Sequence, residues 1–165
     1  MAPRPDRQLY SLLVTVREGP MTEEFLDENP VISRTIQIRG DQTLGRLHET
    51  IFDAFDREDE HLYEFQIGGA GPMDPEAKRY AHPMARADPF PTGATVGDAE
   101  RTTLASLGLE ADEIFGYWFD FGDDWWHQID VVEIEAEAPR GRFPKVTARI
   151  GESPPQYVVW DEFDD

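Results

Sequence analysis

Alternating apolar and polar positions mark several strands along the chain. Residues 9–16, LYSLLVTV, residues 32–39, ISRTIQIR, and residues 61–67, HLYEFQI, each follow a period of two. This period is typical of a half-buried strand, because successive side chains point to opposite faces. In the first segment the apolar side chains of one face are Tyr10, Leu12, Val14 and Val16.

A different period predicts a helix between the second and third of these strands. In residues 41–56, DQTLGRLHETIFDAFD, apolar side chains recur at a spacing of three and four, the pattern of one helical face. They are Leu44, Leu47, Ile51, Phe52 and Phe55. Asp41 or Thr43 can cap the start of this helix, and His48 lies within its apolar stripe.

The remaining segments have weaker signals. Residues 17–30 read as a polar connection, and residues 68–97 form a Gly- and Pro-rich stretch without any period. Asp98 can cap a short helix through the following AERTTLASLGL. Two consecutive aromatic strands then run over Ile114–Phe121 and Trp125–Ile134, and one further short strand lies near the end.

Together these elements predict an α+β fold. We expect a mostly antiparallel sheet of four or five strands with one main amphipathic helix packed on one face, in a β-grasp-like arrangement. A short second helix and a long Pro/Gly-rich excursion complete it. The chain should be a single domain over residues 1–165, with a core from about 9 to 150, an excursion from about 68 to 97, and an acidic C-terminal tail from about 156 to 165.

The amino-acid composition excludes several kinds of site and indicates the cellular environment of the protein. The chain has no cysteine, which excludes disulfides, thiolate metal sites and cysteine nucleophiles. No apolar run approaches the ~20 residues that span a bilayer, and the N-terminal MAPRPDRQ lacks the core of a signal peptide. We therefore expect a cytoplasmic protein that does not associate with a membrane.

The chain is strongly acidic, with 34 Asp and Glu against 15 Lys and Arg and a net charge of -19. An acidic surface that meets a basic partner, a bound cation, and adaptation to high salt each explain such a charge. The acids are scattered through almost every segment and Lys78 and Lys145 are the only lysines. This distribution favours halophilic adaptation. It also disfavours direct DNA binding, which needs clustered basic side chains. The partner that we expect for the chain is another protein.

The residues between the two aromatic strands, FDFGDDWWH, carry candidate chemistry. We predict a two-residue type II′ turn at Gly122 and Asp123, in which Gly122 is the structural residue because it takes positive φ without strain. In that register Asp120 and His127 share a face of the sheet and form a hydrogen-bonded pair. A three-residue loop would instead send Asp120 to the other face.

The candidate polar cluster gathers the histidines of the three patterned segments with the acids of the turn: His48, His61, Asp120, Asp123 and His127. Three imidazoles, those of His48, His61 and His127, could bind a divalent metal with an open position, and a His-Asp pair could act in acid–base catalysis. No short ligand spacing such as HExxH is present, and a histidine on an apolar face more often serves packing. We therefore expect no bound cofactor, with a divalent metal as the alternative.

Three motifs together resemble the plasmid pRiA4b ORF-3-like family. They are Leu47-His48 in the helix, His61-Leu62-Tyr63 at a strand start, and the aromatic hairpin from Phe119 to His127. The similarity covers roughly Tyr10 to Pro155. The family often continues with Cys-Pro-Pro-Glu-Asp and a Gly pair, where this chain has Ser153-Pro154-Pro155-Gln156-Tyr157, so any role of that family segment does not carry over.

The resemblance implies an uncharacterised protein, some of whose relatives travel with mobile elements, and it does not imply a particular chemistry. We expect a non-enzymatic interaction module. The alternative is a metal-dependent or His-Asp hydrolase-type enzyme that uses the motif histidines.

Overall fold

The computed structural model describes residues 5–68, 77–82 and 96–157. Its strands are β1 (Leu9–Glu18), β2 (Ser33–Arg39), β3 (Tyr63–Ile67), β4 (Lys78–Ala81), β5 (Val96–Asp98), β6 (Ile114–Phe119), β7 (Trp125–Glu135) and β8 (Lys145–Ile150). Its helical segments are η1 (Pro5–Arg7), α1 (Glu23–Glu28), α2 (Leu44–Ala54) and η3 (Leu104–Leu107). No helix in this part of the chain has the length and apolar character needed to cross a lipid bilayer.

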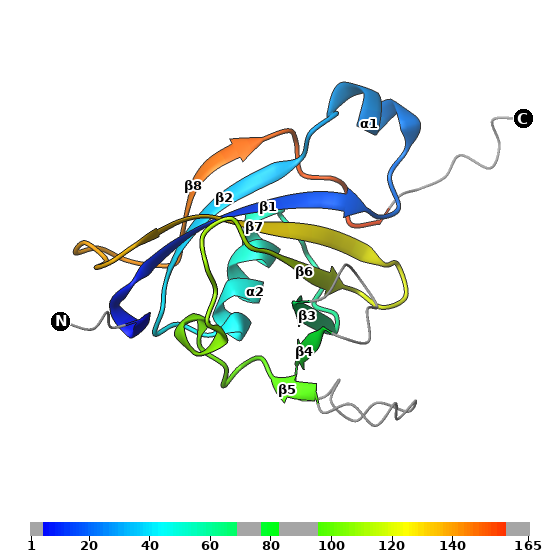
Figure 1. Cartoon of the computed structure of the whole chain (residues 1–165). Coiled ribbons are helices and arrows are strands. Elements are labelled where there is room, and N and C mark those ends of the chain that lie inside the picture. Colours follow the sequence, from blue (N-terminus) through cyan, green and yellow to red (C-terminus); the bar gives the residue numbers. More distant parts are fainter. Residues whose placement is uncertain (1–4, 69–76, 83–95, 158–165) are drawn as a thin grey trace, which may run out of the picture.

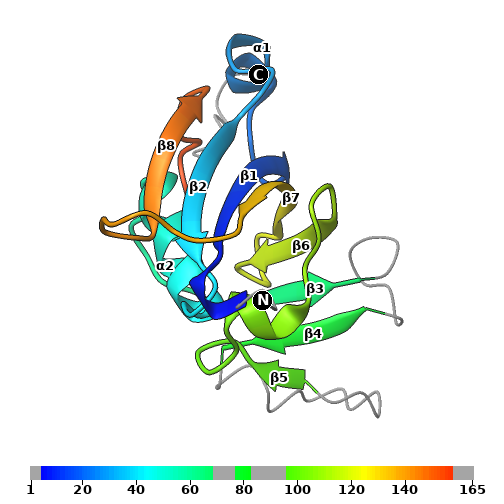
Figure 2. The same cartoon turned by 60° about the vertical axis from the view of Figure 1, so that its left-hand side comes forward.

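The strands form one eight-stranded sheet in the order β5-β4-β3-β6-β7-β1-β2-β8 (Figures 1 and 2). Every neighbouring pair is antiparallel except β4 and β5, which run parallel, so the sheet is mixed. The first strand of the chain, β1, lies near the middle, between β7 and β2. The two outermost strands are β5 and β8.

The predicted α+β, β-grasp-like fold is wrong. The sheet has eight strands instead of four or five, and α2, with 11 residues, is the only helix longer than six residues in the described ranges. The backbone of α2 lies closest to β2 and β8, at one end of the strand order, so it is not a main helix laid across the sheet. The error arose because β4 and β5 have no alternating pattern and were included in the expected excursion.

Other local predictions also need correction. The helix expected after Asp98 is a tight turn, in which the Asp98 carboxylate accepts the Glu100 N–H at 3.0 Å, followed by the 3₁₀ helix η3. The polar connection contains α1, capped by the Thr22 hydroxyl. Of the expected excursion, residues 69–76 and 83–95 lie outside the described residues, as do residues 158–165 of the expected tail.

The alternation predicted for β1 is confirmed. Its inner face carries Tyr10, Leu12, Val14 and Val16, all in the hydrophobic core. Inner-face side chains of β2, β3, β6 and β7 continue this core, and α2 adds Leu44, Leu47 and Ile51. Thr43, one of the two predicted caps, accepts the Arg46 N–H at 3.1 Å and begins α2.

A buried arginine ties α2 to the edge of the sheet. The Arg34 side chain, on the inner face of β2, donates from Nε to the Ala54 carbonyl at the end of α2, at 2.9 Å. Its Nη1 donates to the Ile150 and Gly151 carbonyls at 3.0 and 3.1 Å. Because α2 has no basic residue in its last turn, this guanidinium also supplies the positive charge that a helix C-terminus favours. The contacts fix the chain just before Ser153, where the candidate site begins.

Candidate functional site

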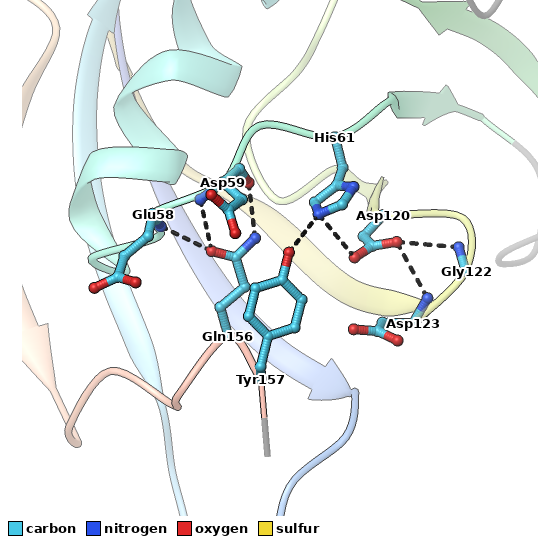
Figure 3. A network of polar contacts seen from close by, with 8 residues as sticks. All are labelled: Glu58, Asp59, His61, Asp120, Gly122, Asp123, Gln156 and Tyr157. Carbon is cyan, nitrogen blue, oxygen red and sulfur yellow. Dashed lines mark hydrogen bonds and ion pairs between the residues drawn. The ribbon is translucent and has the colours of Figure 1, made fainter. Parts of the chain in front are cut away.

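Three separate segments meet in a network of polar contacts at the surface (Figure 3). They are the connection between α2 and β3, the turn between β6 and β7, and residues 153–157 after β8. A hollow of about 350 Å³ adjoins this network, lined by Asp56, Glu58, Ser153, Pro154, Pro155, Gln156 and Tyr157. The site is therefore built by residues from the second half of the chain and by the segment that leaves α2.

Gln156 attaches the C-terminal segment to the connection after α2. Its side-chain oxygen accepts the backbone N–H groups of Glu58 and Asp59, at 2.7 and 2.9 Å, and its Nε2 donates to the Asp59 carbonyl at 2.7 Å. The side chain is 7% exposed. A single amide thus satisfies three backbone groups that the fold leaves without secondary-structure partners.

His61 lies at the centre of the network. Its Nε2 is 2.8 Å from the Tyr157 hydroxyl and 3.5 Å from the Asp120 carboxylate, as Figure 3 shows. The imidazole is about one-third exposed, whereas the Asp120 side chain is only 9% exposed. The pKa of the Tyr157 phenol is raised, first by desolvation and then by its hydrogen bond to Asp59.

The turn geometry fixes Asp120 in place. Its backbone has a φ of 61°, and its Oδ1 accepts the N–H groups of Gly122 and Asp123 at 3.1 and 3.2 Å. The turn closes through the Asp124 N–H, which donates to the Asp120 carbonyl at 2.7 Å. Aspartate is one of the few residues that tolerates this left-handed conformation, because its short side chain bonds the local backbone.

The predicted Asp120–His127 pair is wrong, and so is the predicted register. Strand β6 pairs Phe119 with Trp125 and Tyr117 with His127, so Asp120 follows the last paired residue and contacts His61 instead. The role given to Gly122 is also wrong: the residues of this turn with positive φ are Asp120 and Asp124. The two-residue turn failed as a prediction because two aspartates supply the left-handed positions that glycine was expected to fill.

His48 lies inside the protein, in a polar chain of its own. Its Nδ1 is 2.5 Å from the Tyr117 hydroxyl, its Nε2 is 2.5 Å from the Glu60 carboxylate, and its ring stacks on Tyr63 at 3.7 Å. Burial acts to raise the pKa of the Glu60 carboxyl, but its contacts, above all the hydrogen bond with His48, outweigh burial and lower that pKa. Burial also raises the pKa of Tyr117 well above its usual range, so this hydroxyl stays protonated.

His127 is buried on the inner face of β7, on the other side of Tyr117. Its Nδ1 is 3.3 Å from the Tyr117 carbonyl oxygen, which can only accept, so Nδ1 carries the proton. Burial, and then the charge of Arg57, lower the pKa of His127 to about 3. The imidazole is therefore neutral at ordinary pH, and its Nε2 presents a lone pair.

Arg57 is a buried cation that the sequence pattern did not indicate. Its guanidinium carbon lies 3.9 Å from the centre of the Trp125 ring, and the residue is only 7% exposed. Burial lowers the pKa of Arg57 to about 10, against the opposing effects of Tyr117 and Asp120. The group remains charged at neutral pH.

The motif histidines do not converge on one point. Aromatic rings separate them: the rings of His48 and His61 each lie 5.8 Å from Phe119, and His127 lies 4.9 Å from Tyr117. Within residues 5–68, 77–82 and 96–157, no three His, Asp or Glu side chains form a group that could hold a metal ion. His61, Asp120 and Asp123 do come together at the surface, with Asp123 contributing its backbone N–H.

Five residues of this region were not selected from the sequence: Arg57, Glu60, Tyr117, Gln156 and Tyr157. Tyr117 lies within a predicted aromatic strand, and that pattern gives no sign of its hydroxyl contact with His48. Gln156 and Tyr157 lie in the expected acidic tail, although Tyr157 is uncharged and half-exposed. Their contacts with residues 58–61 join positions that lie far apart in sequence, so no local pattern marks them.

Comparison with known proteins places these motifs in a family. The profile of the family described as "Plasmid pRiA4b ORF-3-like protein" matches residues 24–159, which include α2, the β6–β7 hairpin and Gln156. The uncharacterized protein y4hQ of Sinorhizobium fredii (strain NBRC 101917 / NGR234) is 28% identical over 130 residues, which are 78% of this chain and 60% of that protein. The chain thus spans about 60% of the length of this curated relative.

A solved structure has a similar fold. The crystal structure of a protein of unknown function, MM3350, from Methanosarcina mazei Go1 matches 90% of this chain and 72% of its own, with a TM-score of 0.66 and 23% identity. At that identity the likeness concerns the fold alone. The profile match, in contrast, extends over most of the sequence and over every motif of the candidate site. The chain belongs to the plasmid pRiA4b ORF-3-like family.

Proposed function

We propose that this chain is a non-enzymatic interaction module that binds an acidic, extended segment of another protein along strand β8. The observation that carries the proposal is the open edge of the sheet. β8 is the last strand in the order and pairs with β2 alone among the described strands. In Figure 2 no other strand lies beyond it.

An open edge strand offers a row of backbone N–H and C=O groups to a new strand. Addition of a partner strand to such an edge is a common mode of peptide recognition. β8 has 6 residues, whereas β5, at the other edge, has 3. β8 is therefore the edge with enough length to hold a partner by backbone hydrogen bonds.

The positive charge of β8 and its flanking residues indicates an acidic partner segment. Residues 139–151, PRGRFPKVTARIG, contain Arg140, Arg142, Lys145 and Arg149 and no acid, in a chain with more than twice as many acids as bases. Lys145, Arg140 and Arg142 are exposed. Basic side chains on an edge strand repel a second copy of the same strand, and they attract an acidic segment.

A direct test uses short peptides. A peptide of alternating Glu and Val should bind, and should slow hydrogen exchange of the backbone amides in β8, whereas a peptide of alternating Lys and Val should not. In a Lys145→Glu, Arg142→Glu double variant the affinity should fall at least about tenfold, or ~1.4 kcal/mol.

A matched variant, Lys78→Glu with Arg101→Glu, makes the same charge change at exposed positions outside β8, with Lys78 on β4 at the other end of the strand order, and should bind normally. Backbone pairing requires N–H groups, so a Glu-Pro peptide of equal charge should bind poorly. Equal binding of the Glu-Pro and Glu-Val peptides would reject strand addition.

A second candidate function rests on the contact between His61 and Asp120. The carboxylate is held by two backbone N–H groups and the imidazole is partly exposed, which is the arrangement of an oriented acid–base pair. Hydrolysis of a chromogenic ester that is lost in both His61→Gln and Asp120→Asn, but retained in His82→Gln, would favour this enzyme over the module.

Two broader expectations belong to the same proposal: action in the cytoplasm, and association with mobile elements as the family resemblance implies. Cell fractionation tests the first. Association with mobile elements predicts transposase or plasmid-maintenance genes beside the genes of close relatives. Gene neighbourhoods without such genes would reject this association.

A further inference from the structure

Several buried polar atoms in the described part of the chain have no hydrogen-bond partner. They include both terminal nitrogens of Arg57, Nε1 of Trp125 and Nε2 of His127. Buried polar groups are nearly always paired in native proteins, and an unpaired charge is the costliest exception. The fourth residue of this kind, Gln66, lies elsewhere, on β3.

The three side chains belong to one region. Trp125 and His127 are two residues apart on β7 and both face the core. The Arg57 guanidinium lies over the Trp125 ring, and it also lies 5.8 Å from the ring of Phe119, the strand partner of Trp125. The His127 ring lies 4.9 Å from that of Tyr117, which is two residues before Phe119 on β6.

Asp120, the carboxylate whose charge raises the pKa of Arg57, does not pair with the guanidinium directly. Asp120 uses one oxygen to accept the two backbone N–H groups of its turn and directs the other toward His61. No ion pair joins it to Arg57 among the described contacts. The guanidinium therefore keeps a charge without a direct counter-ion.

The unpaired donors and the acceptor of these three side chains determine which ligand would complement them. Arg57 and Trp125 can only donate. His127 can only accept at Nε2, because its Nδ1 proton is directed to the Tyr117 carbonyl. The complementary molecule has a negative charge, at least two acceptor oxygens for the guanidinium, and one O–H group for the imidazole. A planar guanidinium suits a planar oxyanion with two parallel N–H···O bonds.

We propose that Arg57, Trp125 and His127 form an internal binding site for a small, planar, hydroxyl-bearing oxyanion of the bicarbonate type. The charged oxygens accept from Arg57 and Trp125, and the hydroxyl donates to Nε2 of His127. This site is independent of the proposed interaction at β8, because none of its residues lies on that strand.

The test compares bicarbonate with nitrate, a planar anion of the same charge that lacks the hydroxyl. Thermal unfolding is measured at pH 8 in a constant high concentration of potassium salt, with part of the chloride replaced by either anion. Bicarbonate should raise the melting temperature by a few degrees relative to chloride, as expected for a ligand that binds only the folded state. Nitrate should raise it less.

Two variants separate the contributions. In Arg57→Gln the selective effect of bicarbonate should disappear. In His127→Phe the difference between bicarbonate and nitrate should disappear, because the acceptor of the hydroxyl is gone. Equal melting temperatures in bicarbonate, nitrate and chloride would overturn the proposal. A bicarbonate effect that persists in Arg57→Gln would overturn it as well.

A measurement on the unmodified protein keeps the proposal testable if Arg57→Gln does not fold. The indole N–H signal of Trp125 and the Nε2 signal of His127 should move together in NMR spectra on addition of bicarbonate, and ¹³C-bicarbonate should show a bound signal. Signals that do not respond to bicarbonate would mean that water alone satisfies these groups, and the site would be rejected.

Discussion

Tyr117 connects the buried histidines of the molecule. Its hydroxyl meets His48, and its carbonyl accepts from His127. Since burial keeps the phenol protonated, its O–H can donate to Nδ1 of His48, which leaves the Nε2 proton of that ring for the Glu60 carboxylate. One residue thus sets the proton positions of two imidazoles, a role for which its place in an aromatic strand gave no indication.

The depressed pKa of His127 makes a prediction about stability. Well above pH 6.5 this histidine is neutral in both the folded and unfolded states. As the pH falls from 6.5 toward about 3, the unfolded chain binds a proton that the folded protein does not, so the free energy of unfolding falls. The full effect amounts to several kcal/mol, at about 1.4 kcal/mol for each pH unit.

Carboxylates titrate in part of the same range, so the comparison must be made with a variant. His127→Gln should lose less stability than the parent between pH 6.5 and 4.5, measured by thermal unfolding. NMR should show no titration of the His127 ring above pH 5, and a midpoint near 6.5 would contradict the assignment.

The turn at Asp120 makes a second prediction at the residue scale. Asp120→Ala removes the acceptor of two backbone N–H groups and places alanine at a φ of 61°. We expect a loss of about 1–3 kcal/mol in the free energy of unfolding. Asp120→Asn should cost less, because asparagine tolerates this backbone and can still accept.

Gly122→Ala is the matched control in the same turn. Gly122 is not among the residues with positive φ, and an added Cβ would meet only an Asp120 oxygen, at 3.4 Å. Its effect should stay within about 0.5 kcal/mol. A larger loss at Gly122 than at Asp120 would restore the role that the sequence first suggested for the glycine.

At the scale of elements, the end of α2 and the edge strand β8 depend on one guanidinium. Arg34 bonds the last helical carbonyl and two carbonyls around the end of β8. Arg149 donates to the same Ala54 carbonyl at 2.7 Å. The C-terminus of α2 therefore contacts two positive charges from the sheet, Arg34 on β2 and Arg149 on β8, as a helix C-terminus favours.

Replacement of Arg34 tests this connection. Arg34→Met keeps much of the side-chain length but leaves buried carbonyls without donors, so we expect a loss of about 2–4 kcal/mol in the free energy of unfolding. Arg39→Met removes an exposed ion pair with Asp41 and should cost less than about 1 kcal/mol. Equal losses, measured by denaturant unfolding in the same salt, would show that Arg34 does not join the two elements.

Elements with strong local periodicity could be predicted from the sequence, and those defined by distant partners could not. β1 was predicted because Tyr10, Leu12 and Val14 alternate, and the start of α2 because Thr43 is a good cap. β4 forms because β3 offers it a pairing edge, and β5 forms because β4 does. Neither strand has an alternating pattern that would predict it. The contact of His61 with Asp120 follows from a turn register that two aspartates determine, and Arg57 lies outside every pattern.

At the scale of the whole molecule, the net charge of -19 is the dominant property. The acids are distributed over many segments, so their mutual repulsion acts on the entire fold. The basic stretch around β8 is a local exception. Halophilic adaptation therefore stays our interpretation of the composition, and it leads to a measurable consequence.

The melting temperature should rise with KCl up to molar concentrations, because counter-ions screen repulsion between exposed carboxylates. The comparison with KCl should be made at constant pH, so that no carboxylate changes its protonation. A melting temperature that stays flat or falls between low and molar salt would remove this interpretation and would favour an acidic surface kept for a basic partner.

The position of β1 near the centre of the sheet has a consequence for synthesis on the ribosome. β1 pairs with β2 soon after it in the chain, but its other neighbour is β7, whose Glu135 lies opposite Leu9. Until that segment emerges, both outer edges of the nascent β1–β2 hairpin are unpaired, because β8, the other neighbour of β2, is synthesised after β7. Pairing between strands that lie far apart in sequence slows folding. It also prolongs the time during which the partly folded chain can aggregate. We therefore expect the newborn chain to need protection by a chaperone for most of its translation.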